Sequence, residues 1–403
     1  MKTAVMYGAG NIGRGFIGQL FFLSGYRTQF IDINRTLIDR LNADGGYPHY
    51  TTCGEQYRKT EIENVCGVDG GDPEAVADAI AGAELMATAV GVNILKFIAA
   101  PLAGGLHKRC AQGGRPLNIL ICENKLGADA YLRELVYAHL TDAERAWAEE
   151  NVGFVECSIG RMVPAVPAQL AAENPLSVCA EEFCMLPIDR DACRGGVPEL
   201  THIQPYSPFI FYIQRKLFLH NMTHAMTAYL GALYGDERLW ECALRPEIKL
   251  LTWMAAEESA LALSREHGVD IGPLLGNAAD LLYRYENRLL GDTVARVGRD
   301  TRRKLSGEDR LVGAYKLCRR HGVKPVGIAL GIAAGLHFAG EDDASSSEIA
   351  AFAREHGASE ALVQYTGLHE AEDFALIGTL YDLLDTQSMQ QIVSYVEANK
   401  RVQ

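Results

Sequence analysis

A glycine-rich turn near the start of the sequence restricts the fold of this chain more than any other feature. Gly8, Gly10 and Gly13 form a G-x-G-x-x-G pattern that directly follows the apolar run TAVMY and opens a helical pattern. The first glycine of such a pattern allows a tight turn, the second lets a pyrophosphate approach the backbone, and the third lets the helix pack closely on the strand. Amides of the turn, including those of Asn11 and Ile12, would hold the pyrophosphate at the positive end of the helix. The pattern predicts a strand, a dinucleotide-binding turn and a helix; a glycine-rich turn without a ligand is the alternative.

An acidic residue at the end of the next strand-like run indicates which dinucleotide binds. Asp32 lies 19 positions after Gly13, where a carboxylate accepts hydrogen bonds from a free ribose diol and repels the 2′-phosphate of NADP. NAD is therefore the predicted cofactor, although Arg35 is close enough in sequence to pair with such a phosphate. Thr88 and Val90, at the end of another strand-like run, are predicted to lie against the cofactor; an ordinary strand-to-helix turn is the alternative there.

The order of apolar and amphipathic segments divides the chain into two parts. Strand-like runs such as TQFIDI, LMATAV, LNILIC and VGFVECS alternate with helical patterns in the first part. This alternation predicts a parallel sheet with crossover helices, so residues 1–200 are expected to form an α/β Rossmann-like domain. Long amphipathic segments then predict a mainly α-helical domain over residues 201–403. The polar and apolar stretch between Tyr47 and Val65 predicts an inserted hairpin at the periphery.

Charge and cysteine content exclude several classes of protein. Lys and Arg number 38 against 51 Asp and Glu, a net charge of −13, whereas nucleic acids and anionic membranes demand concentrated basic residues. The 10 cysteines include no CxxC pair, so neither a zinc ribbon nor a redox motif is predicted. The sequence opens without the pattern of a signal peptide and contains no run long and apolar enough for a membrane helix. We expect a cytoplasmic enzyme with a small-molecule substrate.

A polar stripe on an otherwise apolar helix is the outstanding candidate for catalytic groups. In RKLFLHNMTHAMTAYLG, His220, Thr223 and His224 fall within about 80° of Lys216 on an α-helix, and Asn221 lies about 140° away. A partly desolvated lysine among cations has a lowered pKa and serves as a general base. Alternatives are a lysine whose amine reaches solvent, histidines satisfied in the core, and a zinc pair at His220 and His224, although no HExxH motif is present.

Several motifs together resemble the polyol-specific long-chain dehydrogenases, the mannitol dehydrogenase family. GAGNIGRGF in the glycine-rich turn and the spacing K-x4-N-x2-H from Lys216 to His224 carry the resemblance, and TAVGVNIL, LNILICEN, AAEESA and VARVGRDTRRKLSGEDRL extend it over most of the chain. The resemblance implies a zinc-independent mechanism in which Lys216 is the general acid and base. It also implies that Asn124 and Asn221 hydrogen-bond the oxygen on the reacting carbon and that His224 orients substrate hydroxyls.

The opening GAGNIGRGFIG is more similar to the sugar-phosphate members of that family. The implied reaction is NAD-dependent oxidation of D-mannitol 1-phosphate at C5 to D-fructose 6-phosphate. For the phosphate we expect Arg302, Arg303 and Lys304, within a segment of net charge +3 from Arg296 to Arg310, because arginine forks suit phosphate oxygens. A solvated charged face is the alternative for this segment. Open alternatives for the whole protein are a dehydrogenase of a non-phosphorylated polyol or sugar acid and a non-catalytic NAD-sensing protein.

Two departures from the family pattern bear on this expectation. The stretch SIGRMVP carries Gly160 where family members commonly have Asp, which removes a carboxylate from the expected active-site neighbourhood. The stretch after Arg310 and Leu311 lacks a common proline, which affects the shape of the expected phosphate loop.

Glu257 and Glu258 are expected to be helix-surface or interdomain residues and not a catalytic pair.

Overall fold

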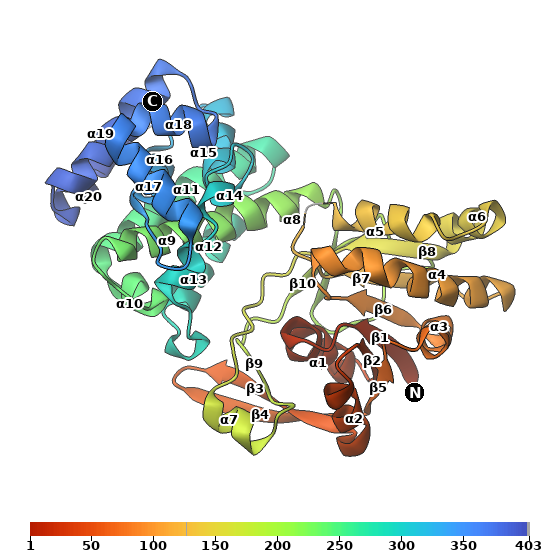
Figure 1. The fold of residues 1–403 in the computed structure, drawn as a ribbon. Coiled ribbons are helices and arrows are strands. Elements are labelled where there is room, and N and C mark those ends of the chain that lie inside the picture. The colour runs from red at the N-terminus through yellow and green to blue at the C-terminus, as the bar shows by residue number, and fades with distance from the viewer. Residues whose placement is uncertain (126, 401–403) are drawn as a thin grey trace. The chain divides into compact units, whose positions relative to one another are not determined.

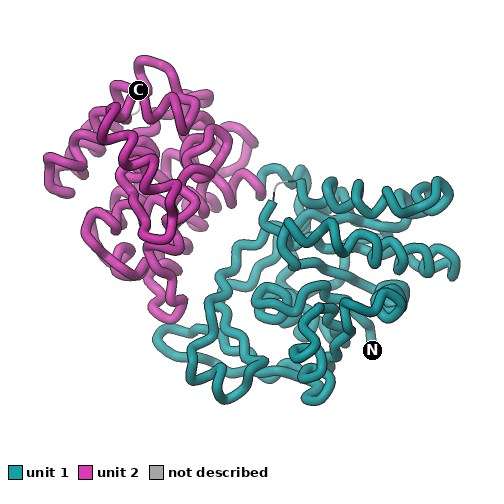
Figure 2. The backbone as a smooth tube through the Cα atoms, viewed as in Figure 1, with its two compact units in different colours: residues 1–212 teal, residues 213–403 magenta. Residues whose placement is uncertain are grey.

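The chain forms two compact units. The computed structural model describes residues 1–125 and 127–400 and divides the chain into Met1–Tyr212 and Ile213–Gln403 (Figure 2). The sequence predicts the boundary between the α/β domain and the helical domain after residue 200, whereas the second unit of the structure begins at Ile213.

One parallel sheet of six strands, whose order reverses beside β1, forms the centre of the first unit. The order is β5-β2-β1-β6-β7-β8, and all neighbouring pairs run parallel. In sheets of this kind, ligands bind beyond the carboxyl ends of the strands where the order reverses. The strands are β1 Lys2–Tyr7, β2 Tyr26–Asp32, β5 Val65–Asp69, β6 Leu85–Thr88, β7 Leu117–Ile121 and β8 Val152–Glu156 (Figure 1).

Side chains of β1 alternate between two buried clusters, which explains why helices cover both faces of the sheet. Ala4 and Met6 belong to one cluster, and Val5 and Tyr7 belong to the other, because successive residues of a strand point to opposite faces. The predicted Rossmann-like architecture is thereby confirmed. The first face is covered by the π-helix η1 Gly13–Ile17, α1 Gly18–Leu23 and α2 Arg35–Asp44; the second is covered by α3 Pro73–Gly82, α4 Leu95–Ala111, α5 Ala128–Tyr137 and α6 Asp142–Asn151, with the 3-10 turn η2 Val92–Ile94 before α4.

The predicted hairpin forms, but its first strand is not peripheral. β3 Gly46–Cys53 pairs antiparallel with β4 Gln56–Glu63, and β9 Val178–Ala180 adds to β3 in parallel. The Tyr47 hydroxyl donates to the Arg14 carbonyl at 2.7 Å, and His49 Nε2 lies 2.9 Å from the Gly15 carbonyl. The expectation of a peripheral hairpin was wrong because β3 packs on η1, and the alternating polarity did not reveal that contact. The unit also contains α7 Ala168–Glu173 and the parallel pair β10 Leu186–Asp189 and β11 Ile203–Tyr206.

The second unit is helical, as predicted, and is organised around one apolar helix. α16 Val326–His337 is buried from Val326 to Leu336 and packs against α9, α11, α15 and α19; a helix that is apolar all round is typical of a core position. None of the helices among the described residues meets the length and hydropathy needed to cross a membrane. The helices are α8 Ile210–Arg215, which spans the boundary, the π-helix η3 Lys216–Asn221, α9 Met222–Ala232, α10 Leu239–Leu244, α11 Pro246–His267, α12 Ile271–Tyr285, η4 Arg288–Leu290, α13 Val294–Gly298, α14 Thr301–Lys304, α15 Arg310–Arg320, α16, α17 Ala344–His356, α18 Ala358–Thr366, α19 Ala371–Thr386 and α20 Met389–Asn399.

A buried carboxylate caps the central helix. Glu258 of α11 is 3% exposed and accepts hydrogen bonds from the amides of Gly327 at 2.8 Å and Ile328 at 3.0 Å. These amides lie in the first turn of α16, where no preceding helical carbonyl is available to accept their hydrogen bonds. Burial raises the pKa of Glu258 to about 7, opposed by the two amides. The expectation that Glu258 is a surface or interdomain residue was therefore wrong, whereas Glu257 is more exposed and pairs with Lys400.

Replacing this cap tests its contribution to stability. Glu258→Ala leaves two buried amides without partners, and we expect it to lower the free energy of unfolding by at least about 2 kcal/mol. Glu257→Ala is the adjacent control and should cost less than about 1 kcal/mol, because it breaks a more exposed ion pair. Urea denaturation followed by circular dichroism measures both values, and equal losses would refute the capping role.

Candidate active site

The glycine-rich turn lies at the carboxyl end of β1, in contact with the turn that follows β6. Gly8 has φ +101°, and a Cβ there would lie 2.5 Å from the Ala89 carbonyl oxygen. A Cβ at Gly13 would overlap the Gly8 carbonyl, so only glycine permits this approach of helix and strand. At Gly10 a Cβ would meet no described atom within 4 Å. The turn thus leaves open space above Gly10, as a pyrophosphate requires.

The end of β2 offers a carboxylate held by backbone amides. Asp32 accepts hydrogen bonds from the Ala9 amide at 2.8 Å and the Asn34 amide at 2.9 Å. A carboxylate has further lone pairs and can still accept from a ribose hydroxyl. Arg35, whose position in the sequence would favour NADP, forms an ion pair with Asp69 at 2.5 Å. Since Asp69 is the register neighbour of Asp32, this end of the sheet presents two carboxylates.

The end of β6 presents a buried hydroxyl and a turn tied to β7. Thr88 is fully buried, and its Oγ1 has no hydrogen-bond partner among the described residues. The amides of Val90 and Gly91 each donate to the Glu123 carboxylate at 2.9 Å. Sequence reasoning did not select Glu123, although an acidic residue directly after the buried run LNILIC was a usable signal. Asn124 follows it and is exposed.

An exposed apolar residue beside Asp32 was also missed. Ile33 directly follows β2 and is 82% exposed. An apolar side chain beside the carboxylate that would bind the adenosine ribose offers a surface on which the adenine ring could pack. Nothing in the local pattern distinguishes it from an ordinary loop residue.

A π-helical turn carries the predicted general base. η3 Lys216–Asn221 precedes α9 without a break, and in a π-helix backbone hydrogen bonds join residues five positions apart. Lys216 and Asn221 are five positions apart, so the turn brings Asn221 closer to the Lys216 face than the 140° expected of an α-helix. The angle predicted for Asn221 assumed an α-helix, and the π-helical turn replaces that assumption.

Burial and neighbouring cations perturb the titratable groups of this segment. Burial, and then the Arg310 charge, lower the pKa of Lys216 to about 8. Burial, followed by Arg296 and Lys304, lowers the pKa of His224 to about 3, and burial also places the pKa of His220 well below its usual value. Both imidazoles are therefore neutral near pH 7, and Lys216 exchanges its proton close to that pH.

Asp292, which sequence reasoning did not select, lies beside His224. His224 Nε2 is 3.3 Å from Asp292 Oδ2, but the two atoms are not aligned for a hydrogen bond, and both lack other partners among the described residues. The other carboxylate oxygen of Asp292 pairs with Arg296. Two buried polar atoms without partners mark a place where a substrate hydroxyl could be bound.

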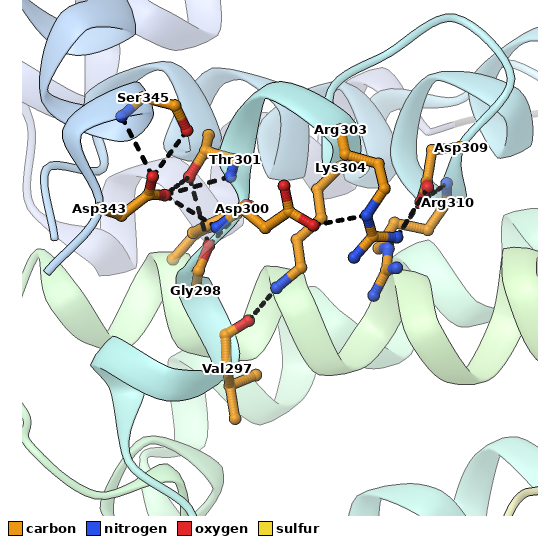
Figure 3. Close-up of polar contacts among 11 residues, drawn as sticks. Val297, Gly298, Asp300, Thr301, Arg303, Lys304, Asp309, Arg310, Asp343 and Ser345 are labelled. Carbon is orange, nitrogen blue, oxygen red and sulfur yellow. Dashed lines mark hydrogen bonds and ion pairs between the residues drawn. The ribbon is translucent and has the colours of Figure 1, made fainter. Parts of the chain in front are cut away.

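The three cations predicted to bind phosphate lie in different environments. Arg302 pairs with Glu348 at 2.7 Å, and Arg303 contacts Asp300 and Asp309. Lys304 is buried and donates to the Val297 carbonyl (Figure 3). Burial, and then Arg310 and Arg303, lower the pKa of Lys304 to about 7, opposed by Asp300 and Asp309.

Arg310 was part of the predicted basic segment but was not selected. It is buried and contacts Asp309 at 2.7 Å (Figure 3), and its positive charge helps to lower the pKa values of Lys216 and Lys304. Arg310 therefore links the basic segment electrostatically to the predicted base.

The structure also shows the surroundings of the two sequence departures. Among the described residues, a Cβ at Gly160 would come within 4 Å of Phe183 alone, at the ordinary contact distance of 3.6 Å, so a Cβ is tolerated there. The stretch after Arg310 is helical, within α15, and a Cβ at Gly313 would lie 2.5 Å from Phe218 of η3. The segment expected as a loop is thus the helix that packs on the π-turn. Over the described ranges, no group of three or more His, Cys, Asp or Glu side chains is arranged to hold a metal ion.

A Rossmann sheet with a dinucleotide-type glycine-rich turn, followed by a separate helical unit, is typical of two-domain dehydrogenases. The mannitol dehydrogenase Rossmann domain matches residues 2–202, and the mannitol dehydrogenase C-terminal domain matches residues 209–376. The chain therefore belongs to the mannitol dehydrogenase family, a family of polyol dehydrogenases with an NAD-binding Rossmann domain. The predicted fold class and the predicted cofactor are confirmed.

Two solved structures share this fold over nearly the whole chain. Pseudomonas fluorescens mannitol 2-dehydrogenase, in a ternary complex with NAD and D-mannitol, is 15% identical, with 98% of this chain and 94% of that chain covered and a TM-score of 0.72. D-sorbitol dehydrogenase in substrate-free form is 16% identical, with coverage of 99% and 94% and a TM-score of 0.74.

The carboxylate at the end of β2 provides a test of cofactor choice. Asp32→Ala removes an acceptor for the ribose diol, and we expect the dissociation constant for NADH to rise about 10- to 100-fold while that for NADPH does not rise. Fluorescence titration measures both constants. Asp44→Ala, which removes only an ion pair with Arg40 on α2, is the control. Tighter binding of NADPH than NADH by the unmodified protein would contradict the assignment.

Proposed function

We propose that this protein is a mannitol-1-phosphate 5-dehydrogenase. In this proposal it catalyses the reversible, zinc-independent oxidation of D-mannitol 1-phosphate at C5 to D-fructose 6-phosphate with NAD. The observation that carries the proposal is Lys216, a lysine with a pKa lowered to about 8 on the same helical segment as Asn221 and His224. A lysine of this pKa is an effective general base near neutral pH.

The cofactor fits the first unit. Three features lie along the carboxyl edge of the sheet, on both sides of its reversal: the open space over Gly10, the Asp32 carboxylate and the hydroxyl of Thr88, which has no hydrogen-bond partner within the described part of the chain. Amides of Asn11, Ile12 and Gly13 would hold the pyrophosphate, and Asp32 the adenosine ribose. When bound, NAD supplies a hydride acceptor for the carbon that bears the alcohol.

Side chains of the protein transfer the hydroxyl proton and bind the oxygen on the reacting carbon. Neutral Lys216 removes the hydroxyl proton during oxidation, and protonated Lys216 returns it to the carbonyl oxygen during reduction. The family resemblance assigns Asn124 and Asn221 as donors of hydrogen bonds to that oxygen, which would stabilise its developing negative charge. Neutral His224, beside Asp292, binds another substrate hydroxyl.

Positive charge near Lys216 that carboxylates compensate only in part supports an anionic substrate. The pKa values of both Lys216 and Lys304 are lowered by Arg310, in addition to burial. An anion bound near these groups would relieve their mutual repulsion. We therefore assign the phosphate first to Lys304 and Arg310, then to Arg303, whose charge is shared with two carboxylates. Arg302 contributes least because Glu348 already pairs with it.

A non-phosphorylated polyol or sugar acid is the second candidate. Two of the three predicted phosphate ligands, Arg302 and Arg303, are already paired with carboxylates. The fold is also shared with mannitol 2-dehydrogenase and D-sorbitol dehydrogenase. A sugar acid such as fructuronate or tagaturonate would supply a carboxylate to the same cations. A non-catalytic NAD-sensing protein would bind NAD and turn over none of these compounds.

The substrate class is tested by NADH oxidation with D-fructose 6-phosphate, fructose, fructuronate and tagaturonate. We expect the highest kcat/KM with fructose 6-phosphate, and a rise in its KM of about 10- to 100-fold in Lys304→Ala, since a charged hydrogen bond to phosphate is lost. Arg302→Ala should raise KM less than Lys304→Ala does. Activity confined to an unphosphorylated ketose or keto acid would exclude the phosphate assignment.

The general base is tested by substitution and by pH. Lys216→Ala should lower kcat about 10²- to 10⁴-fold with an unchanged circular dichroism spectrum. Because the neutral amine is the base, kcat for oxidation should rise with pH and level off above the pKa of about 8, whereas the reduction rate should fall over the same range. Lys249→Ala, in an exposed ion pair with Glu286, is the control. Undiminished turnover by folded Lys216→Ala would refute the mechanism.

A further inference from the structure

The Glu123 carboxylate uses both of its oxygens to hold one backbone turn. Glu123 is 7% exposed; its Oε1 accepts from the Val90 amide at 2.9 Å, and its Oε2 accepts from the Gly91 amide at 2.9 Å. Two charge-assisted hydrogen bonds to consecutive amides restrict the turn more than a single neutral bond does. A buried carboxylate with this geometry fixes the conformation of the segment it contacts.

The turn held by Glu123 is in direct contact with the glycine-rich turn. The Ala89 amide donates to the Tyr7 carbonyl at 2.9 Å. The Ala89 carbonyl oxygen and Val90 Cγ1 lie 2.5 Å and 3.1 Å from the position that a Cβ of Gly8 would take. A displacement of the turn after β6 would therefore change the space available beside Gly8.

This contact belongs to the half of the dinucleotide site opposite Asp32. Asp32 ends β2, on one side of β1, whereas the turn of Val90 follows β6, on the other side. In sheets with this reversal, the two mononucleotide halves of a dinucleotide lie on opposite sides of it. Thr88, at the end of β6, is fully buried, and its hydroxyl has no hydrogen-bond partner among the described residues, so the β6 side carries a second polar group with unused hydrogen-bonding capacity.

We propose that Glu123 is the positioning residue for the nicotinamide half of the cofactor site. It acts through the Val90 and Gly91 amides without contacting the cofactor. Because Asn124 follows directly in the chain, Glu123 also ties the position of that amide to the same turn. The inference rests on the proposed function, in which NAD occupies this edge of the sheet.

The experiment compares two ligands that share only part of their chemistry. ADP carries the adenosine and pyrophosphate, whereas NADH also carries the nicotinamide ribose and ring. In Glu123→Gln the amide oxygen can accept one of the two N–H groups, but its NH₂ group opposes the other. We expect the dissociation constant for NADH to rise about tenfold and that for ADP to change less than about twofold. Isothermal titration calorimetry measures both.

Glu258→Gln is the matched control. Glu258 also accepts from two consecutive amides, but it does so in the helical unit, so its replacement should leave both ligand affinities unchanged. Glu123→Asp keeps the charge but is one methylene too short to reach both amides, and it should weaken NADH alone by about threefold. This second variant serves if Glu123→Gln does not fold.

The outcomes separate this inference from the proposed function. Equal weakening of ADP and NADH would show that Glu123 supports the fold generally, and no weakening of either would show that the turn does not depend on it; each result overturns the inference. Failure of the unmodified protein to bind NADH would instead overturn the proposed function. Lower kcat for ketose reduction at saturating NADH in Glu123→Gln, without a change in KM, would support the link to Asn124.

Discussion

A row of backbone hydrogen bonds that continues past the ends of the strands holds the first unit together at its functional edge. The Gly8 amide donates to the Ile31 carbonyl, the Ala89 amide to Tyr7, and the Cys122 amide to Thr88. Each bond ties the start of one turn to the neighbouring strand. Without a Cβ at Gly8, two of these turns come into direct contact. This row of hydrogen bonds fixes the strand ends that carry Asp32, Thr88 and Asn124. Each of these residues lies at the end of a strand or a few residues beyond it.

A different constraint acts in the helical unit, where positively charged side chains are buried away from water. Burial disfavours the charged forms of Lys216 and Lys304, and the positive charge of Arg310 opposes them further. Carboxylates compensate part of this charge. The same environment keeps His220 and His224 neutral, so the imidazoles supply polar atoms without adding charge. Among these basic groups, Lys216 and Lys304 are therefore the ones that exchange protons near neutral pH.

Local sequence patterns predicted those features that depend on neighbours in the chain. Glycine spacing, strand-helix alternation and the acidic residue after β2 are rules of short range, and they led to the fold class and to NAD. Features created by tertiary contacts did not follow from sequence: η3 is a π-turn and not an α-helix, β3 is buried under η1, and Glu258 caps a helix from another part of the chain. Likewise, a run of basic residues did not reveal that Arg302 pairs with Glu348 whereas Lys304 is buried.

Because Lys304 is buried, an anion that binds beside it binds together with a proton on the lysine. With its pKa lowered to about 7, Lys304 is only partly charged at pH 7.5, and a bound anion would raise that pKa again. Binding is then linked to proton uptake, so affinity for the anion falls as pH rises. In the proposed mechanism, Lys216 imposes the opposite requirement on oxidation, because only its neutral form is a base. Under that mechanism the two lysines define a narrow pH interval in which the anion is held and the proton can still be removed.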